Sequence, residues 1–222
     1  MDSLLSLIEK YRAGLESIGS QPPPAPRWNQ DWFPRLDAAA AYAMVRGTRP
    51  QRIVEVGSGH STRFLARAVA DGGLDTRITA IDPEPRASLA GLKVDWIATP
   101  VQRVAAFPAL GAGDILFIDS SHQVKPGSDV EFLLNAVLPL LPAGVRVHFH
   151  DIFLPDDYPE HWAWRRYNEQ SEVKKLVDCG AWRIDFSSHA VVSRSPEEIH
   201  GVLARLPLVP GAIESSLWLT RQ

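Results

Sequence analysis

The chain has 222 residues, of which 45% are hydrophobic and 22% charged, a formal net charge of −3 and one cysteine, Cys179. These values are typical of one globular domain that buries a sizeable core. They exclude an internal disulfide, a zinc site of several thiolates and the basic field that draws proteins to nucleic acids, so we expect small or neutral partners.

The N-terminal segment combines a helical pattern with a proline-rich stretch. Apolar residues recur at helical spacing behind Asp2 and Ser3 and predict an amphipathic helix over residues 3–18. Four prolines at 21–26 cannot continue this helix and predict a stiff linker.

We therefore divide the chain into a helix with its linker, residues 1–30, and one domain, residues 31–222. The first twenty residues mix charges with apolar positions and resemble neither a signal peptide nor a membrane span. We expect a cytoplasmic protein without membrane contact. The amphipathic helix needs a surface to cover, and pairing with a second copy into a homo-oligomer is one way to cover it.

Predicted strands and helices alternate along the rest of the chain. We predict helices at 34–46, 61–71, 127–138 and 161–178 and from Ser195 onward, and strands at 52–56, 77–81, 93–97, 114–119, 145–150, 181–187 and 215–220. This alternation is typical of a doubly wound α/β fold, a mostly parallel sheet with helices on both faces. The apolar run at 115–118 predicts a central strand.

A buried strand breaks into a glycine turn at residues 53–62. Gly57 and Gly59 lack a Cβ, so the backbone can turn sharply and approach a ligand. The free amides at the start of the next helix favour a carboxylate or a phosphate. Asp82, at the end of the following predicted strand, is placed to accept hydrogen bonds from ribose hydroxyls. Together these features predict an adenosine site.

The details of the turn distinguish between adenosine cofactors. A nicotinamide dinucleotide site requires glycine at the sixth position, where this chain has Thr62. The segment Glu55-Val56-Gly57-Ser58-Gly59 resembles the first motif of class I S-adenosylmethionine (SAM)-dependent methyltransferases, and Asp82 resembles their acidic second motif. Ser61 stands where the family has its third glycine.

The resemblance implies which residues contact SAM: the glycine turn packs on the methionine part and Asp82 binds the ribose. The candidate cofactor-binding residues are Glu55, Gly57, Ser58, Gly59, Ser61, Thr62, Asp82, Gln102 and Asp119. Gln102 lies about where the family places residues against adenine, although an ordinary surface residue would look the same.

A second motif supports the same family. Residues 113–122, Gly-Asp-Ile-Leu-Phe-Ile-Asp-Ser-Ser-His, resemble the family's fourth motif, in which an acid faces the methyl-transfer site. The resemblance covers about 33–220 and is strongest at 53–151. It points in particular to small-molecule O-methyltransferases, including those that act on sugars of natural products. It implies a seven-stranded sheet of order 3-2-1-4-5-7-6 whose last strand is antiparallel.

Polar side chains follow two of the predicted strands: Asp119 and His122 after one, His150 and Asp151 after the other. Neighbouring strands lie about 4.8 Å apart, so these side chains can meet. Methyl transfer from a sulfonium requires an aligned acceptor and removal of a proton. Asp119 and His122 are therefore the candidate catalytic residues, and for His122 both a base and a turn-capping role stay open.

The resemblance extends to metal-dependent O-methyltransferases, in which acids at these strand ends hold magnesium. It implies a divalent metal, magnesium or manganese, at Asp119 and Asp151, with His150 as a candidate third ligand. An imidazole either shifts the preference toward manganese, iron or zinc or lies outside the metal's ligand shell. The alternative is that the acids bond loop amides and that His148 and His150 are satisfied core imidazoles.

The sequence thus predicts SAM-dependent O-methyl transfer to a small hydroxylated molecule. Four aromatic residues follow the predicted strand at 145–150, and they cover either the acceptor or the core: Tyr158, Trp162, Trp164 and Tyr167. Two alternatives stay open, a dinucleotide-binding oxidoreductase that uses the same crevice and a SAM-binding module without activity that acts through its N-terminal helix.

Overall fold

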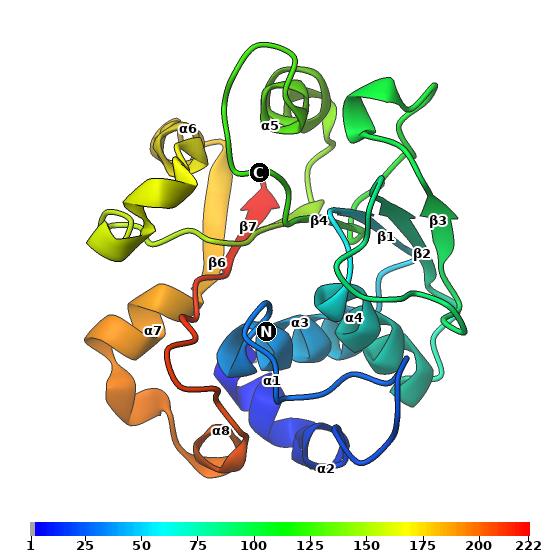
Figure 1. The fold of residues 1–222 in the computed structure, drawn as a ribbon, viewed down its shortest axis with the longest axis vertical. Helices are drawn as coiled ribbons and strands as arrows, with labels where there is room; N and C mark the ends of the chain where they lie inside the picture. Colours follow the sequence, from blue (N-terminus) through cyan, green and yellow to red (C-terminus); the bar gives the residue numbers. More distant parts are fainter. Residues whose placement is uncertain (1–2) are drawn as a thin grey trace.

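The computed structural model describes residues 3–222, which form a seven-stranded sheet with helices on both faces (Figure 1). The strands are β1 (Arg52–Val56), β2 (Arg77–Ile81), β3 (Asp95–Ile97), β4 (Ile115–Ile118), β5 (Arg146–Phe149), β6 (Trp182–Ser187) and β7 (Leu217–Arg221). Their order is β3-β2-β1-β4-β5-β7-β6, and β7 is antiparallel to both of its neighbours. The predicted fold class, strand order and antiparallel last strand are confirmed.

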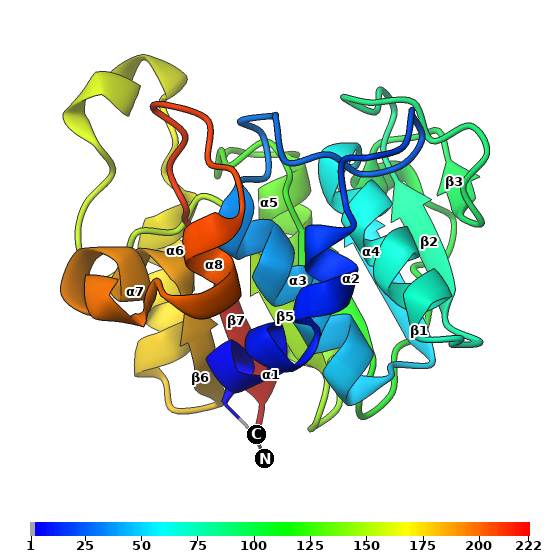
Figure 2. The ribbon, with the colours of Figure 1, turned by 90° about the horizontal axis from the view of Figure 1, so that it is seen from below.

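The helices divide into two layers (Figures 1 and 2). One face of the sheet packs against α1 (Leu4–Lys10), α2 (Arg12–Glu16), α3 (Arg35–Thr48), α4 (His60–Asp71) and α8 (Gly201–Arg205), and the other against α5 (Asp129–Phe132) and α6 (Glu169–Asp178). The central helix α3 carries four consecutive alanines, residues 38–41, that are fully buried. Their small side chains let α3 pack closely on the sheet and its neighbours.

The N-terminal segment belongs to the same hydrophobic core as the sheet. The predicted helix over 3–18 is interrupted at Tyr11, which separates α1 from α2. Ile8 and Leu15 are 1% and 0% exposed, and the indole of Trp28 donates to the Leu15 carbonyl at 3.2 Å. The apolar face of these helices is therefore covered by the chain itself. The division at residue 30 stays a prediction, as does the homo-oligomer.

The predicted helix at 161–178 is wrong in its first half. Residues Glu160–Arg165 form a 3₁₀ helix that ends at Arg166, whose φ is +55°, and α6 begins only at Glu169. The left-handed backbone at Arg166 interrupts the helix because it breaks the i to i−4 hydrogen-bond ladder.

The segment after β6 also differs from the expectation. A helix that the sequence did not predict, α7 (Ser188–Arg194), begins where the Ser187 side chain accepts from the Ala190 amide at 3.2 Å. Ser195 ends this helix and starts only the 3₁₀ turn Pro196–Glu198. The predicted capping pattern therefore starts only one short turn, and the next helix, α8, begins a few residues later.

The carboxyl ends of the parallel strands meet at one end of the molecule, the upper edge in Figure 2. The loops around 20–33, 83–93, 155–167 and 207–214 gather at this edge. Ligands of open α/β sheets bind at this end, so it is the place to look for a site. Within residues 3–222 there is no helix with both the length and the apolar character that crossing a bilayer requires.

The burial of α1 predicts that shortening one of its apolar side chains lowers the stability of the fold. Ile8→Ala should lower the free energy of unfolding by about 2–4 kcal/mol, because it leaves a cavity in the shared core. Lys10→Ala, on the exposed side of the same helix, should change it by less than about 0.5 kcal/mol. Urea denaturation measures both. Equal and small effects would show that the helix does not unfold together with the sheet.

Candidate functional site

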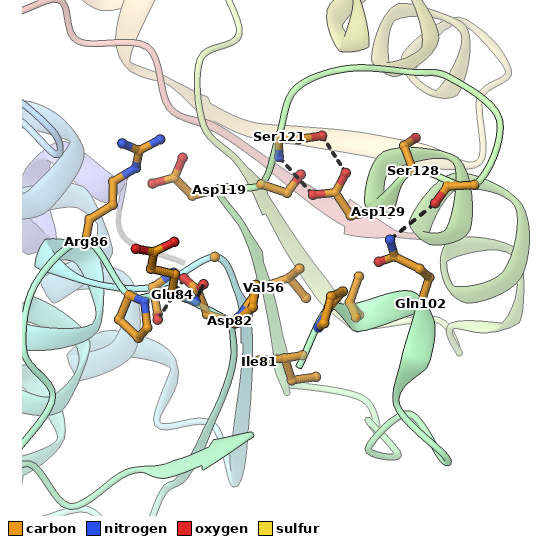
Figure 3. A pocket seen from close by; sticks show the side chains of 18 of the residues that line it. Val56, Ile81, Asp82, Glu84, Arg86, Gln102, Asp119, Ser121, Ser128 and Asp129 are labelled. Carbon is orange, nitrogen blue, oxygen red and sulfur yellow. Dashed lines mark hydrogen bonds between the residues drawn. The ribbon is translucent and has the colours of Figure 1, made fainter. Parts of the chain in front are cut away.

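A cavity of about 660 Å³ opens at the carboxyl ends of β1, β2 and β4 (Figure 3). Five of the predicted cofactor-binding residues line it: Gly57, Ser58, Asp82, Gln102 and Asp119. The other four, Glu55, Gly59, Ser61 and Thr62, are not among its lining residues. The cavity thus lies over the first half of the glycine turn and not over the start of α4.

The close approach of the end of β4 requires glycine at position 57. Its φ is +78°, and a Cβ on it would collide with the backbone carbonyl oxygen of Asp119, directly after β4. From the sequence, this glycine is expected to allow close approach of a ligand. The structure instead shows that it allows the ends of β1 and β4 to touch, so any side chain here would strain the turn and push Asp119 away.

Asp82 joins the glycine turn to the loop after β2. Its Oδ2 accepts from the Ser58 amide at 2.6 Å and from the Ser58 hydroxyl at 3.0 Å, and its Oδ1 accepts from the Glu84 amide at 2.8 Å. A carboxylate offers about four acceptor positions, so one remains for a ligand.

Glu84 is a lining residue that the sequence analysis missed. Its side chain lies beside Asp82 in the cavity, and it is exposed (Figure 3). The available signal was a second acid in Asp82-Pro-Glu84, two positions after the predicted ribose ligand. Two carboxylates at the end of β2 provide acceptors for a pair of neighbouring hydroxyls.

Glu55, a buried residue of β1, stabilises the glycine turn that follows this strand. It is 0% exposed and accepts from the Ser61 hydroxyl at 2.6 Å. Burial raises the pKa of Glu55 to about 8, against the opposing effect of hydrogen bonds from Ser61 and Thr62. The side chain is therefore mostly protonated at neutral pH, and it stabilises the strand-to-helix turn.

Gln102 and Asp129 both act on the loop between β4 and α5. The Gln102 amide donates to the Gly127 carbonyl at 3.2 Å. Asp129, in the first turn of α5, accepts from the Ser121 amide at 2.9 Å. These contacts hold the loop that forms one wall of the cavity (Figure 3).

A second cavity of about 120 Å³ adjoins the first at Asp119. Its walls come from six separate parts of the chain, and its lining includes Trp32, Arg86, Asp119, His122, His150, Asp151, Trp162, Arg165 and Tyr167. The structure therefore brings together the polar residues that the sequence placed at the ends of β4 and β5. We call Asp119, His122, His150 and Asp151 the His–Asp cluster.

Each imidazole of the His–Asp cluster faces both carboxylates. His122 Nε2 lies 3.3 Å from Asp119 Oδ1 and 3.5 Å from Asp151 Oδ2. His150 Nδ1 lies 3.5 Å from Asp119 Oδ1 and 3.4 Å from Asp151 Oδ1. These separations exceed the roughly 2.7–2.9 Å of a charge-assisted hydrogen bond. The four groups therefore surround a small shared space instead of forming tight pairs.

The outer nitrogen of each imidazole is held by a buried carboxylate. Glu169 Oε2 lies 2.9 Å from His122 Nδ1, and Asp37 Oδ2 lies 3.2 Å from His150 Nε2. Asp37 also accepts from the Ser215 amide at 3.0 Å. Such partners fix ring orientation and tautomer, so both inner nitrogens are presented to the cavity.

The sequence analysis missed Asp37 and Glu169 because each lies far along the chain from its histidine. Asp37 is 113 positions from His150, and Glu169 is 47 positions from His122. The signal for Asp37 was an acid within an alanine-rich helical run. An acid in such a run must be paired if it is buried.

In the His–Asp cluster, positively charged imidazoles alternate with negatively charged carboxylates. Burial disfavours the charged form of His122, but hydrogen bonds to Asp119 and Glu169 hold its pKa well above the usual value. Burial acts likewise on His150, and the charges of Asp151 and Asp119 raise its pKa well above normal. Burial would raise the pKa of Asp119, but the two imidazoles hold it far below the usual range.

The backbone at the cluster is locally strained. His122 and Asp151 both have a φ of +56°, in the left-handed region that non-glycine residues rarely adopt. Arg166, next to the lining residue Arg165, has a φ of +55°. Strained residues of this kind concentrate at functional sites, where the surrounding structure enforces them.

His148 lies outside the cavity. It is 0% exposed, its Nε2 is 2.8 Å from the Ser216 hydroxyl, and its ring stacks on Phe117 with centroids 3.7 Å apart. Burial lowers its pKa well below normal, so it is a neutral core imidazole.

The metal hypothesis stays a prediction. Among residues 3–222, no three His, Cys, Asp or Glu side chains are arranged closely enough to hold an ion as they stand. The hypothesis therefore requires the side chains of the His–Asp cluster to adjust around an ion.

Two of the four predicted aromatic residues line the second cavity. Trp162 and Tyr167 contribute to its wall, and the Tyr167 ring lies 4.6 Å from the His122 ring. Tyr158 instead accepts from the Gln170 amide at 3.1 Å, and Trp164 is 74% exposed. The segment after β5 thus supplies aromatic faces beside the histidines.

Known proteins resemble this chain in the same region and in the overall fold. Residues 54–152 match the model of a family described as a methyltransferase domain. No curated protein matches the sequence significantly. A solved methyltransferase structure shares the fold over the whole chain, so the chain has a methyltransferase fold.

Two of these solved structures illustrate the likeness. The methyltransferase PaMTH1 of Podospora anserina, bound to S-adenosylhomocysteine (SAH), has a TM-score of 0.54 and 16% identity over 100% of this chain and 89% of its own. Cofactor-bound Rv0187 from MTB has a TM-score of 0.53 and 14% identity over 97% of this chain and 89% of its own.

The buried Glu55 predicts a pH-dependent stability. Its pKa is about 8 in the folded chain against an ordinary value of 4.5, so the folded state binds more protons between these values. Stability should therefore fall as pH rises through this window, by on the order of 1.4 kcal/mol per pH unit. Glu55→Gln cannot ionise and lacks this contribution.

Urea denaturation from about pH 5 to about pH 8 measures the difference between wild type and variant, which should grow in favour of Glu55→Gln. Glu84→Gln, at an exposed position, is the matched control and should show no such trend. A difference that stays constant with pH would contradict a protonated Glu55.

Proposed function

We propose that this chain transfers the methyl group of SAM to a hydroxyl group of a small molecule, with assistance from a divalent metal. One observation carries the proposal: Asp119 lines both the cavity beside the glycine turn and the cavity of the His–Asp cluster. A donor in the first and an acceptor in the second would meet at this residue. In-line displacement requires such an arrangement.

The first cavity fits SAM in size and in its polar groups. Its volume of about 660 Å³ lies within the usual range of ligand pockets, about 300–1,000 Å³. SAM, when bound, supplies a methyl group activated on a sulfonium. Asp82 has a free acceptor position for a ribose hydroxyl, and Glu84 adds a second carboxylate beside it.

His122 is placed to remove the acceptor proton once it is neutral, and a divalent metal bound beside it by Asp119 and Asp151 would favour the neutral form. Its Nε2 faces the second cavity, and Glu169 holds the opposite side of the ring. An imidazole that is fixed in this way needs no reorientation when the proton moves. Trp162 and Tyr167 cover the same cavity and exclude water from the reacting groups.

Asp119, Asp151 and His150 would hold the metal, and His122 lies beside them. The nitrogens and carboxylate oxygens of the cluster lie 3.3–3.5 Å apart, and among residues 3–222 these side chains would have to adjust around an ion. Histidine ligands also commonly donate their other nitrogen to a carboxylate, as Asp37 and Glu169 allow. A metal here supplies positive charge to the acceptor oxygen. The imidazoles favour manganese, iron or zinc over magnesium.

The charge and the small volume of the site favour a small acceptor. The net charge of −3 gives no field for nucleic acid, and the second cavity measures about 120 Å³. Aromatic and hydrogen-bonding side chains line it together, as in sites that bind small hydroxylated molecules.

The cofactor assignment is tested by SAH binding and methyl transfer. Calorimetry should give micromolar affinity, and Asp82→Asn should weaken it about 5- to 150-fold, because a carboxylate acceptor with buried donors is lost. Asp95→Asn, an exposed acid on β3, is the control and should bind like wild type. Transfer of labelled methyl groups to a library of phenols, sugars and polyols tests the activity.

A protein that fails to bind SAH would contradict the proposal. Binding of SAH with no transfer to any acceptor would favour the module without activity. Tight binding of a nicotinamide dinucleotide in place of SAH would favour the oxidoreductase.

The metal is tested by removing it. Exhaustive chelation should lower turnover at least about tenfold, and added manganese should restore it. Asp151→Asn should lose this response and still bind SAH, because asparagine tolerates the left-handed backbone at this position. Turnover that survives chelation would contradict metal assistance, and a loss of rate in His122→Ala would then assign the proton removal to His122 alone.

A further inference from the structure

Arg165 is held in the wall of the second cavity with unused hydrogen-bonding capacity. Its guanidinium lies over the rings of Trp162 and Trp164, 4.3 and 5.0 Å from their centroids, and its Nη1 donates to the Tyr167 hydroxyl at 3.0 Å. Its Nε is buried and has no hydrogen-bond partner among residues 3–222. A buried donor without a partner is rare in folded proteins and calls for an explanation.

Arg86 reaches the same cavity from the loop after β2. Its guanidinium lies 4.3 Å from the centroid of the Trp32 ring. Within the described part of the chain, the Arg86 side chain forms no hydrogen bond and no ion pair. Arg165 forms no ion pair with an acid of residues 3–222. Two guanidinium groups thus line one small cavity without a neutralising carboxylate.

Two of the three acids that line the cavity face the histidines instead of the arginines. Asp119 and Asp151 face the two histidines of the His–Asp cluster at 3.3–3.5 Å. Asp31, the remaining acid in the lining, forms no ion pair with either arginine in residues 3–222. The positive charge of the arginines is therefore available to a ligand.

We infer that the acceptor is a hydroxylated aromatic carboxylic acid and that Arg165, assisted by Arg86, binds its carboxylate. Guanidinium groups form paired hydrogen bonds with a planar carboxylate, and stacking on aromatic rings leaves their donor edge free. Trp162 and Tyr167 provide faces for an aromatic ring in the same cavity. A cavity of about 150 Å³ accommodates benzene, so the second cavity of about 120 Å³ has to widen at its loops to take a substituted ring.

Substituting Arg165 distinguishes binding of a carboxylate on the acceptor from binding of the carboxylate on the cofactor. SAM carries a carboxylate of its own, and Arg86 lines both cavities. Arg165 lines only the second cavity. The inference rests on the proposed function, because it names the acceptor class of that site, and Arg165 is the residue on which it is tested.

The test compares acids with their neutral amides. 3-Hydroxybenzoate and 4-hydroxybenzoate, and the corresponding hydroxybenzamides, are titrated into the complex of the full chain with SAH, with calorimetry as the readout. At least one acid should bind at least about tenfold more tightly than its amide, because the amide cannot pair with a guanidinium charge. Arg165→Gln should abolish this preference and leave the affinity for SAH within about twofold.

Arg166→Gln is the matched control, since Arg166 is adjacent, exposed and outside the lining of the cavity. It should keep the preference for the acid. If Arg165→Gln does not fold, Arg165→Lys retains the charge without the paired geometry and should reduce the preference partly.

Equal affinity for acid and amide, no binding of any probe, or a preference that survives in Arg165→Gln would overturn the inference. The outcome is separable from that of the proposed function. A wild-type chain that does not bind SAH contradicts the methyltransferase, whereas one that binds SAH and ignores the carboxylate contradicts only the acceptor class.

Discussion

The contact between Gly57 and the backbone of Asp119 is the constraint on which the site depends. Because the residue after β1 has no side chain, the ends of the two central strands touch, and Asp119 lies between the two cavities. A side chain at position 57 would separate the strand ends and move Asp119 away from both. The glycine is therefore needed by the protein's own packing before any ligand binds. The two cavities adjoin because the ends of β1 and β4 are in contact at this point.

Buried carboxylates support this arrangement, and each is compensated differently. Glu55 lies beneath the turn, and its pKa of about 8 means that it is largely neutral. Asp37 and Glu169 are buried beside histidines, and Asp37 also receives two backbone amides. A buried acid is tolerated only if it is protonated or paired. The same pairs that remove this penalty fix the two imidazoles, so stability and function share their interactions.

The strand pattern and the glycine turn could be predicted because they are local. Alternating strands and helices indicate the sheet, and Asp119 and His150 follow from the rule that parallel strands end at the same edge. Asp37, Glu169 and Arg165 could not be found in this way. Their roles depend on contacts between distant segments, and the segment of Arg165 looks helical in sequence but ends at a left-handed Arg166. Periodicity cannot reveal one backbone angle that is set by tertiary packing.

The two halves of the site are built from different kinds of structure. The first cavity rests mainly on the ends of β1, β2 and β4, whose positions are fixed by the sheet. Much of the second is formed by the loop segments 31–32, 160–167 and 211–213, which carry Trp32, Trp162, Arg165 and Tyr167. Loops can change their side chains without disturbing a core, whereas strand ends cannot. In the proposed function, recognition of the acceptor would therefore depend on the loops, and the His–Asp cluster lies where they meet the sheet. The proposed methyl transfer would thus rely on the rigid strand ends, and the choice of acceptor on the loops.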